Sequence, residues 1–345
     1  MKYSMIPTIE WTEDNKVKMI DQTILPHELK FLLFDNYRDV ATSIKIMNIR
    51  GAPAIGAAAA MGMALATIEY KSLPKERFIE KMEEAANLIR STRPTASNLF
   101  WAVNRIWKII ETYPDEPSQL SELVIEEAKI MAQEDITVNK NIGKFGAELL
   151  KDGDTVLTHC NAGSLATVQY GTALAPVRSA IKQGKKINVI ADETRPRLQG
   201  ARLTAYECQY DKIPVKVISD NSSGLLMRLG KVDKVIVGTD RVSSDAVFNK
   251  IGTYLVALAA KDNDIPFYVA APTSTLSLQD TVDDVTIEQR DATEVSNVLG
   301  KVQIVPEGIE CLNYAFDITP FRLVSGIITE DGVFTPEEML SKYKK

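Results

Sequence analysis

Residues 155–163 read TVLTHCNAG, a short β-branched run that ends in polar and small residues. Such a run predicts a buried β-strand followed by a loop. Runs of this form alternate in the second half of the chain with helix-like stretches near 164–183, 199–209, 221–229 and 250–262. The predicted strands are Thr155–Thr158, Ile187–Ala191, Val215–Ser219, Val235–Val237 and Phe267–Ala270. This alternation predicts an α/β fold with a parallel, doubly wound sheet.

The first half of the chain reads mainly as helix. Apolar residues recur at helical spacing in Tyr37–Ile46, Ala52–Glu69, Glu76–Ile89, Ser97–Glu111 and Ser118–Glu134. Before them, Ile9–Trp11 and Lys16–Ile20, with a turn near Leu25-Pro26, predict a short β-hairpin. We therefore expect a mainly helical domain over 1–127 and a sheet domain over 128–345.

Composition excludes several classes of protein. The 345 residues are 45% hydrophobic and 25% charged, the balance of a soluble globular chain, and the net charge is −6. A nucleic-acid partner is not expected, because binding phosphates requires a concentrated basic face. A membrane partner is not expected either, since the longest apolar candidate, Ala52–Ala66, falls short of the ~20 residues of a membrane helix. The N-terminal sequence MKYSMIPTIEW has no signal-peptide character, which predicts a cytoplasmic protein.

The cysteines and histidines predict neither a disulfide framework nor a metal site. Cys160, Cys208 and Cys311 are odd in number and far apart, which is typical of a reducing compartment. Only His27 and His159 are present, and no C-x-x-C motif occurs, so no metal is expected.

Polar residues gather where the predicted strands end, which is where parallel sheets bind ligands. Cys160 follows the first strand and precedes an expected helix, a position that favours a thiolate, although a cysteine can also serve as a small apolar residue. Asp240 follows the fourth strand and faces the ligand side, unless it caps a helix or pairs with Arg241. His159 is expected to be structural, because adjacent residues of a strand point to opposite faces.

The second strand ends in the acidic pair Asp192 and Glu193, which has the same two interpretations. The pair can serve the ligand, or Arg195 and Arg197 can simply neutralise it.

Three cationic segments suggest a phosphate ligand, although the chain has neither G-x-G-x-x-G nor a P-loop. Arg50–Ala52 precedes a helix of small residues, where free backbone N–H groups can bind an anion. Asn249 and Lys250 are expected to introduce a second helix in the same way, and Arg93 adds a cation. Each segment alone can be structural. Together they predict a small phosphorylated ligand held between the two domains.

Several motifs resemble the methylthioribose-1-phosphate isomerase family, and the resemblance spans about Ile9–Pro336. They are IRGAPAIG at 49–56, TRPTA at 92–96, LTHCNAG at 157–163, DETRP at 192–196, LQGARLTA at 198–205, GTDR at 238–241 and NKIGTY at 249–254. The resemblance implies a helical N-terminal domain, a Rossmann-like C-terminal domain and a homodimer.

The resemblance also implies roles for individual residues. It assigns catalysis to Cys160 and Asp240. It assigns substrate binding to Arg50, Gly51, Ala52, Arg93, Gln199, Asn249 and Lys250. The cationic segments described above already predicted all of these residues except Gln199.

The implied reaction converts 5-methylthioribose 1-phosphate into 5-methylthioribulose 1-phosphate in methionine salvage, on the way to L-methionine, and requires no metal or other cofactor. One alternative is a ribose-1,5-bisphosphate isomerase, whose second phosphate calls for an extra basic cluster that the sequence lacks. Another is a noncatalytic regulatory subunit of the translation-initiation exchange factor, which has no need to keep both Cys160 and Asp240.

Overall fold

A computed structural model describes residues 5, 7–94, 96–113 and 116–344 as two compact units. The helical unit comprises residues up to Thr137 together with Ser164–Gly171, and the sheet unit comprises Val138–Gly163 and the residues from Thr172 onward. The division falls inside the helix α5 (Pro117–Ala147), which also contains the expected boundary at 127/128. The domain boundary at 127/128 stays a prediction.

The helical unit begins with an antiparallel sheet in the order β1 (Ile9–Trp11), β2 (Val17–Ile20), β3 (Phe31–Phe34). The expected hairpin is present, and β3 adds a third strand that the short run FLLF did not reveal. The helices α1 (Tyr37–Lys45), α2 (Ala52–Tyr70), α3 (Lys75–Thr92), α4 (Ser97–Thr112) and α5 follow, as the helical spacing predicted.

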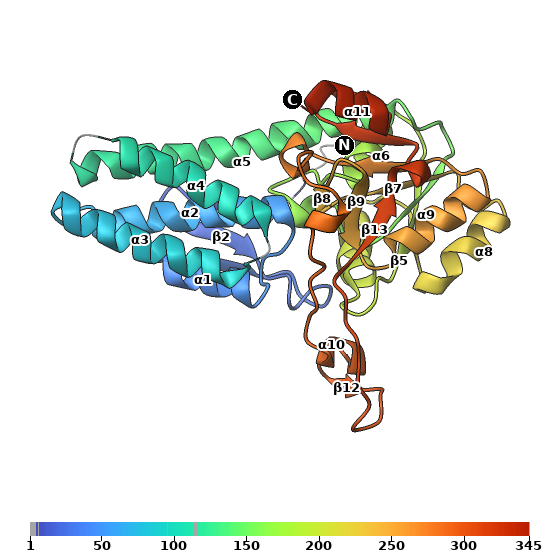
Figure 1. The fold of residues 1–345 in the computed structure, drawn as a ribbon, viewed down its shortest axis with the longest axis horizontal. Helices are drawn as coiled ribbons and strands as arrows, with labels where there is room; N and C mark the ends of the chain where they lie inside the picture. The colour runs from blue at the N-terminus through green and yellow to red at the C-terminus, as the bar shows by residue number, and fades with distance from the viewer. Residues whose placement is uncertain (1–4, 6, 95, 114–115, 345) are drawn as a thin grey trace. The chain divides into compact units, whose positions relative to one another are not determined.

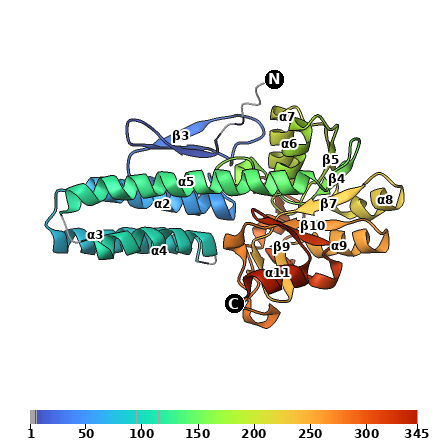
Figure 2. The same cartoon turned by 90° about the horizontal axis from the view of Figure 1, so that it is seen from above.

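The helix α2 is the centre of this unit. Every residue from Ala54 to Thr67 is buried, and helices α1, α3 and α4 pack around it (Figure 1). The strands β1 and β2 also contact α2, and their sheet, labelled at β3 in Figure 2, lies on the side of α2 away from α3 and α4. By length and composition alone α2 could cross a membrane, but a helix that is apolar on all sides and buried is the core helix of its unit.

The sheet unit is built on a seven-stranded sheet in the order β15-β14-β10-β7-β4-β5-β6. The strands predicted from sequence are β4 (Thr155–Thr158), β5 (Asn188–Asp192), β6 (Val215–Ile218), β7 (Lys234–Val237) and β10 (Phe267–Ala270), all parallel. Two strands near the C-terminus were missed: β14 (Gly326–Thr329) extends the parallel order, and β15 (Gly332–Phe334) closes the edge in the antiparallel sense.

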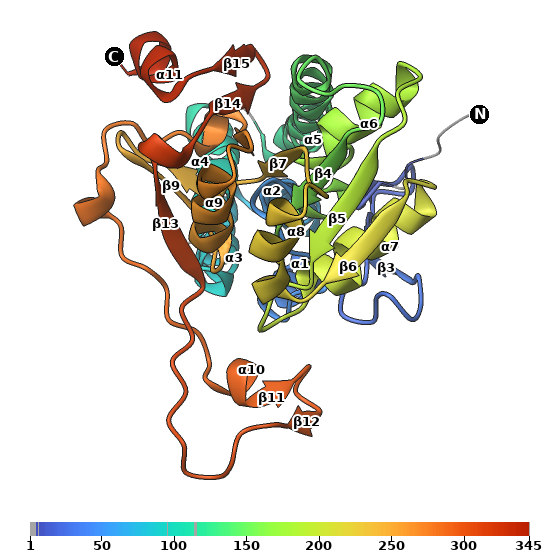
Figure 3. The ribbon, with the colours of Figure 1, turned by 90° about the vertical axis from the view of Figure 1, so that its right-hand side faces the viewer.

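Helices cover both faces of this sheet because alternate residues of each strand are apolar on opposite sides (Figure 3). On β4, Val156 packs with α6 (Leu174–Lys182), α7 (Ala205–Tyr210) and the end of α5. Leu157 packs with the opposite cluster, which includes α8 (Ser223–Arg228), α9 (Thr253–Asp262) and α11 (Pro336–Tyr343).

A second small sheet corrects the expectation for Asn249 and Lys250. These residues lie in the strand β9 (Ala246–Lys250), between β8 (Arg241–Val242) and β13 (Phe316–Pro320), and α9 starts later, at Thr253. The helix-start interpretation was wrong because β13 is far away in the sequence, so no local pattern could reveal this pairing.

The stretch 164–183 is also less helical than expected. Only Leu174–Lys182 forms an α-helix, preceded by the 3₁₀ turn Ser164–Ala166. Between β10 and β13, residues 285–315 of the sheet unit form an arm that extends away from the seven-stranded sheet (Figure 3). The arm carries α10 (Thr293–Ser296), β11 (Asn297–Val298) and β12 (Val302–Gln303).

Candidate active site

Cys160 lies in a tight turn that follows β4. Its φ of 66° is in the left-handed region, which a side chain such as cysteine adopts only when the surroundings impose it. Two buried threonines impose it here: the Cys160 N–H donates to Thr194 Oγ1 at 2.8 Å, and Thr204 Oγ1 donates to the Cys160 carbonyl at 2.7 Å. The backbone of the turn is therefore held on both sides of the cysteine.

No helix begins directly after Cys160, which corrects the helix-dipole argument for a thiolate. The next α-helix of the sheet unit, α6, starts only at Leu174. A thiolate at Cys160 has to depend on neighbouring charges instead.

A buried ion network supports the Cys160 turn through Asn161, the next residue of the chain. Asn161 donates to Glu207, and Arg178 Nη2 donates to Glu207 Oε2 at 2.7 Å and to Asp211 Oδ2 at 2.6 Å. Gly163 closes against the same carboxylate, because a Cβ at this position would lie 2.0 Å from Glu207 Oε1. Sequence reasoning missed this network because its members come from the loop after β4, from α6 and from the end of α7.

Asp240 follows β7 and directly precedes β8. Its N–H donates to the carbonyl of Phe248 on β9 at 3.0 Å, so the residue starts a strand pair and does not cap a helix. Its side chain is exposed. The neighbouring Arg241 pairs with Asp280 at 3.1 Å.

Lys250 brings two of the predicted catalytic residues into one electrostatic environment. It is 8% exposed, and its Nζ donates to the carbonyl of Ala315 at 2.7 Å and lies 5.1 Å from the centre of the Phe316 ring. Burial lowers the pKa of Lys250, while the charges of Cys160 and Asp240 oppose that shift. Cys160 and Asp240 are therefore both close enough to act on Lys250, although the three residues come from different segments.

The side chains of Asn249 and Gln199 differ in how they are satisfied. Asn249 Nδ2 donates to Thr253 Oγ1 at 3.0 Å. Gln199 is 8% exposed, and its Oε1 has no hydrogen-bond partner within the described residues. A buried polar atom without a partner is costly, so this amide is suited to a ligand hydroxyl.

Asp317 is a charged residue of this region that sequence reasoning did not select as a site residue. It lies on β13 opposite Asn249 and accepts hydrogen bonds from Gly252 N at 2.7 Å and Tyr254 N at 3.1 Å, where α9 begins. Burial raises the pKa of Asp317 to about 6. The only sequence signal was its place in the motif NYAFD at 313–317.

His159 is structural in the sense that both ring nitrogens are engaged, as expected. Its ring, Asp192 and Asp220 have ligand-type atoms within 4.8 Å of one another, the kind of trio that can hold a metal ion. Each of these atoms already has a protein partner: Ser223 donates to Asp192, and the N–H groups of Thr194 and Arg195 donate to Asp220. The trio is a closed hydrogen-bond network.

The basic residues after β5 pair with groups other than those expected. Arg197 pairs with Glu294 of the arm at 2.6 Å, and Arg195 donates to the carbonyl of Val295 at 2.9 Å. The ring of His159, with Nδ1 at 2.9 Å from Oδ2, is a hydrogen-bond partner of Asp192.

The helical unit contains the remaining predicted residues Arg50, Gly51, Ala52 and Arg93. Gly51 is the N-cap of α2 with a φ of 96°, and a Cβ there would lie 2.4 Å from the Ala166 carbonyl oxygen, so only glycine fits. Arg93 is the C-cap of α3.

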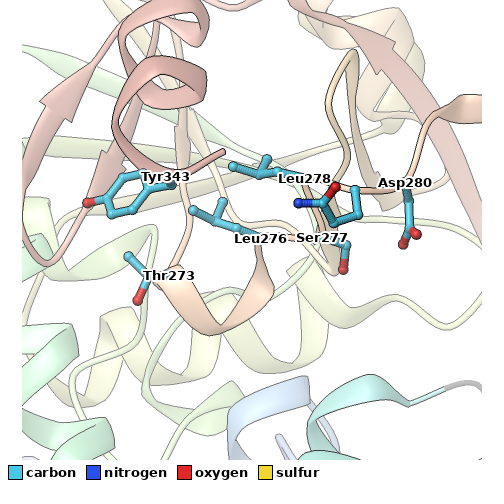
Figure 4. Close-up of a pocket in the computed structure, with 7 residues that line it drawn as sticks. Thr273, Leu276, Ser277, Leu278, Asp280 and Tyr343 are labelled. Carbon is cyan, nitrogen blue, oxygen red and sulfur yellow. The ribbon is translucent and has the colours of Figure 1, made fainter. Parts of the chain in front are cut away.

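A pocket of about 470 Å³ lies elsewhere in the sheet unit, between the loop after β10 and the end of α11 (Figure 4). It is lined by Thr273, Leu276, Ser277, Leu278, Gln279, Asp280 and Tyr343. None of the predicted site residues lines this pocket. We place the candidate site instead at Cys160, Asp240 and Lys250, because the charges of the first two act on the third.

Comparison with known proteins shows the family of the chain. Residues 48–336 match the model of the initiation factor 2 subunit family. Methylthioribose-1-phosphate isomerase of Thermosipho africanus is 54% identical over 339 residues, covering 97% of each chain. The crystal structure of 5-methylthioribose 1-phosphate isomerase from Pyrococcus horikoshii OT3 has a TM-score of 0.92 at 43% identity and covers 98% of this chain and 95% of that one.

A second solved structure has a different name. The crystal structure described as translation initiation factor eIF-2B, subunit delta, from A. fulgidus has a TM-score of 0.90 at 46% identity, covering 99% of this chain and 100% of that one. With curated relatives at this identity over nearly the full length, the chain belongs to the initiation factor 2 subunit family, among its methylthioribose-1-phosphate isomerases.

Proposed function

We propose that this chain is an aldose–ketose isomerase that converts 5-methylthioribose 1-phosphate into 5-methylthioribulose 1-phosphate, a step of methionine salvage. The observation that carries the proposal is that Cys160 and Asp240 follow the neighbouring parallel strands β4 and β7 at their carboxyl ends, where such sheets bind ligands. The charges of both residues also act on the buried Lys250. The relatives from Thermosipho africanus and Pyrococcus horikoshii carry this activity in their names.

The reaction needs an acid because C1 of the sugar is blocked as a phosphate ester. The acid protonates the ring oxygen, the C1–O bond to the ring breaks, and hydrogen moves from C2 to C1. The C2 hydroxyl loses its proton as the ketone forms at C2, which balances the proton that the acid supplied. We assign the acid to Asp240. A carboxyl that donates a proton near neutral pH must be shielded from water, and the side chain of Asp240 is exposed in this fold, so bound substrate has to provide the shielding.

Cys160 has two possible roles in the hydrogen transfer. It either carries the C2 proton through an enediolate or stays neutral and shapes a dry site for a hydride shift. Both routes balance without an added oxidant or cofactor. The two threonine hydrogen bonds that fix the Cys160 backbone serve either route, because each requires the sulfur at one position over C2.

Substrate binding is assigned to the remaining residues of the family pattern, which are Arg50, Gly51, Ala52, Arg93, Gln199, Asn249 and Lys250. The start of α2 offers backbone N–H groups beside an arginine, a suitable arrangement for a phosphate. Lys250 supplies a buried cation, and the unpartnered amide oxygen of Gln199 is suited to accept a hydrogen bond from a sugar hydroxyl.

The test is turnover of 5-methylthioribose 1-phosphate by purified variants. Asp240→Asn keeps the size of the side chain but cannot act as an acid, so the single-turnover rate should fall by roughly 100-fold or more. Cys160→Ser should be nearly inactive if the sulfur carries the proton, and only modestly slower if it excludes water. Cys208→Ser and Cys311→Ser are the matched controls and should retain activity in folded protein. Turnover by Asp240→Asn within about threefold of the parent contradicts the assignment.

The same assay separates the competing functions. Turnover of ribose 1,5-bisphosphate in place of the methylthio sugar identifies the bisphosphate isomerase. Turnover of neither sugar supports a binding subunit, the role suggested by the name of the A. fulgidus structure.

We also propose that the protein is a cytoplasmic homodimer that uses no cofactor and binds neither nucleic acid nor membrane.

The arm carries a surface suited to the dimer. Four of its apolar side chains are each more than half exposed: Val302, Ile304, Ile309 and Leu312. Large apolar side chains gathered on one exposed segment are typical of a surface that a partner covers, and a second copy is the partner that the family resemblance implies. A monomer at micromolar concentration in analytical ultracentrifugation contradicts the dimer.

A further inference from the structure

A buried histidine connects two segments of the candidate site without belonging to the residues assigned to the reaction. His159 is 1% exposed and directly precedes Cys160. Its Nδ1 lies 2.9 Å from Asp192 Oδ2, and its Nε2 lies 2.8 Å from the carbonyl oxygen of Ile251, the residue after Lys250.

The two partners determine where the protons of this ring are. A carbonyl oxygen can only accept, so Nε2 carries a proton. Both carboxyl oxygens of Asp192 are engaged, since Ser223 Oγ donates to Oδ1 at 2.6 Å and Oδ2 faces Nδ1. With Asp192 as the acceptor of both hydrogen bonds, Nδ1 also donates, and a ring with two N–H groups is an imidazolium.

The charges around His159 favour this state. Asp192 on β5, Asp220 in the turn after β6 and Asp317 on β13 are the carboxylates whose charges act on the ring. Burial alone lowers the pKa of His159, but the hydrogen bond and charge of Asp192, the Ile251 carbonyl and the charge of Asp220 outweigh burial and raise it.

The segment after Lys250 lies directly against the ring. Gly252 has a φ of 103°, and a Cβ there would lie 2.8 Å from His159 Cε1 and 2.9 Å from Nε2. The ring of His159 is therefore packed directly against the backbone that follows Lys250.

We propose that His159 is a positioning residue that acts as an imidazolium and couples the Cys160 turn to the end of β9, so that Cys160 and Lys250 keep their relative placement. The effect on turnover rests on the proposed isomerase function, whereas the charge state of His159 does not. As the pH rises through the value at which His159 loses its proton, the ring loses its hydrogen bond to either Asp192 or the Ile251 carbonyl, and turnover falls.

The charge state can be measured without any substrate. The chain has two histidines, and His27 is exposed in the helical unit, so protein labelled with ¹⁵N-histidine gives two sets of imidazole signals. The variant His27→Gln identifies those of His159. We expect both ring nitrogens of His159 to be protonated at pH 7.5. A neutral His159 with one N–H at pH 7 overturns the proposal.

The positioning role is tested by Asp192→Asn, which keeps an acceptor for Nδ1 but removes the negative charge. The fall of kcat with rising pH should then begin at a lower pH than in the parent, and the histidine signals should titrate over the same lower range. Asp154→Asn is the matched control, because Asp154 is a buried aspartate that precedes β4, at the opposite end of the sheet. It should leave the pH profile unchanged.

The outcomes are separable. An Asp192→Asn enzyme that is slower at every pH with an unshifted profile shows a merely structural role and overturns the positioning role. If Asp192→Asn does not fold, the parent decides: a fall of kcat at the pH where the His159 signals titrate supports the role, and its absence overturns it. No turnover in the parent overturns the proposed isomerase and the role in turnover with it, while the ¹⁵N spectra still decide the charge state.

Discussion

Replacing Arg178 with methionine removes a buried cation and leaves two buried carboxylates without their counter-ion. Arg178 is 4% exposed and donates to Asp211 Oδ2 from Nε at 2.8 Å and from Nη2 at 2.6 Å, and to Glu207 Oε2 at 2.7 Å. Methionine fills a similar volume, so the loss is mainly electrostatic. Removing one partner of a buried ion pair costs roughly 3–5 kcal/mol, and we expect this loss in the free energy of unfolding at pH 8.

The loss should depend on pH in a defined direction. Burial already raises the pKa of Asp211, and Arg178 opposes that shift, so the pKa rises further in the variant. The folded variant then holds a proton that the unfolded chain has lost, and its stability decreases as the pH rises above ~4 by up to about 1.4 kcal/mol per pH unit. The variant should be closest to the parent at pH 5.5 and furthest from it at pH 8.

The assay is urea unfolding followed by circular dichroism at pH 5.5 and pH 8, together with turnover under native conditions. Because Glu207 also accepts from Asn161 beside Cys160, kcat should fall in the folded variant. Arg77→Met is the matched control, since Arg77 forms an exposed pair with Glu80 that is worth roughly 0–1 kcal/mol. A loss below about 1 kcal/mol at pH 8, or an equal loss at both pH values, refutes the electrostatic reasoning.

Three further substitutions test other contacts of the sheet unit. Gly163→Ala places a Cβ 2.0 Å from Glu207 Oε1 and should lower the free energy of unfolding, measured by chemical denaturation, by roughly 1–3 kcal/mol or more. The control Gly224→Ala has its nearest atom 3.5 Å away and should cause no loss. Equal effects of the two substitutions contradict this reasoning. Gln199→Leu should raise KM by roughly 2- to 10-fold without loss of stability, because its Oε1 has no partner among the described residues; an unstable variant with normal KM shows a structural role instead. Burial raises the pKa of Asp317 to about 6, so the folded chain binds a proton that the unfolded chain has lost, and stability decreases between pH ~4 and 6. Asp317→Asn should remove this dependence on pH from urea midpoints measured across that range. If the dependence persists, another group causes it.

Local sequence patterns determined most of the secondary structure and the positions of the two proposed catalytic residues. The apolar spacing of α2 and the β-branched runs of β4, β5, β7 and β10 depend only on neighbouring residues, so they could be read without a partner. A parallel sheet places its ligand side at the carboxyl ends of its strands, which selected Cys160 and Asp240.

The tertiary structure alone decided the contacts between distant segments. Lys250 lies in a strand because β13 pairs with β9, and it is buried beside Cys160 because the two chain segments meet in the fold. His159 lies 92 positions before Ile251, whose carbonyl requires its second ring proton. Burial and hydrogen-bond partners set these charge states, and both depend on residues that a local sequence pattern does not contain.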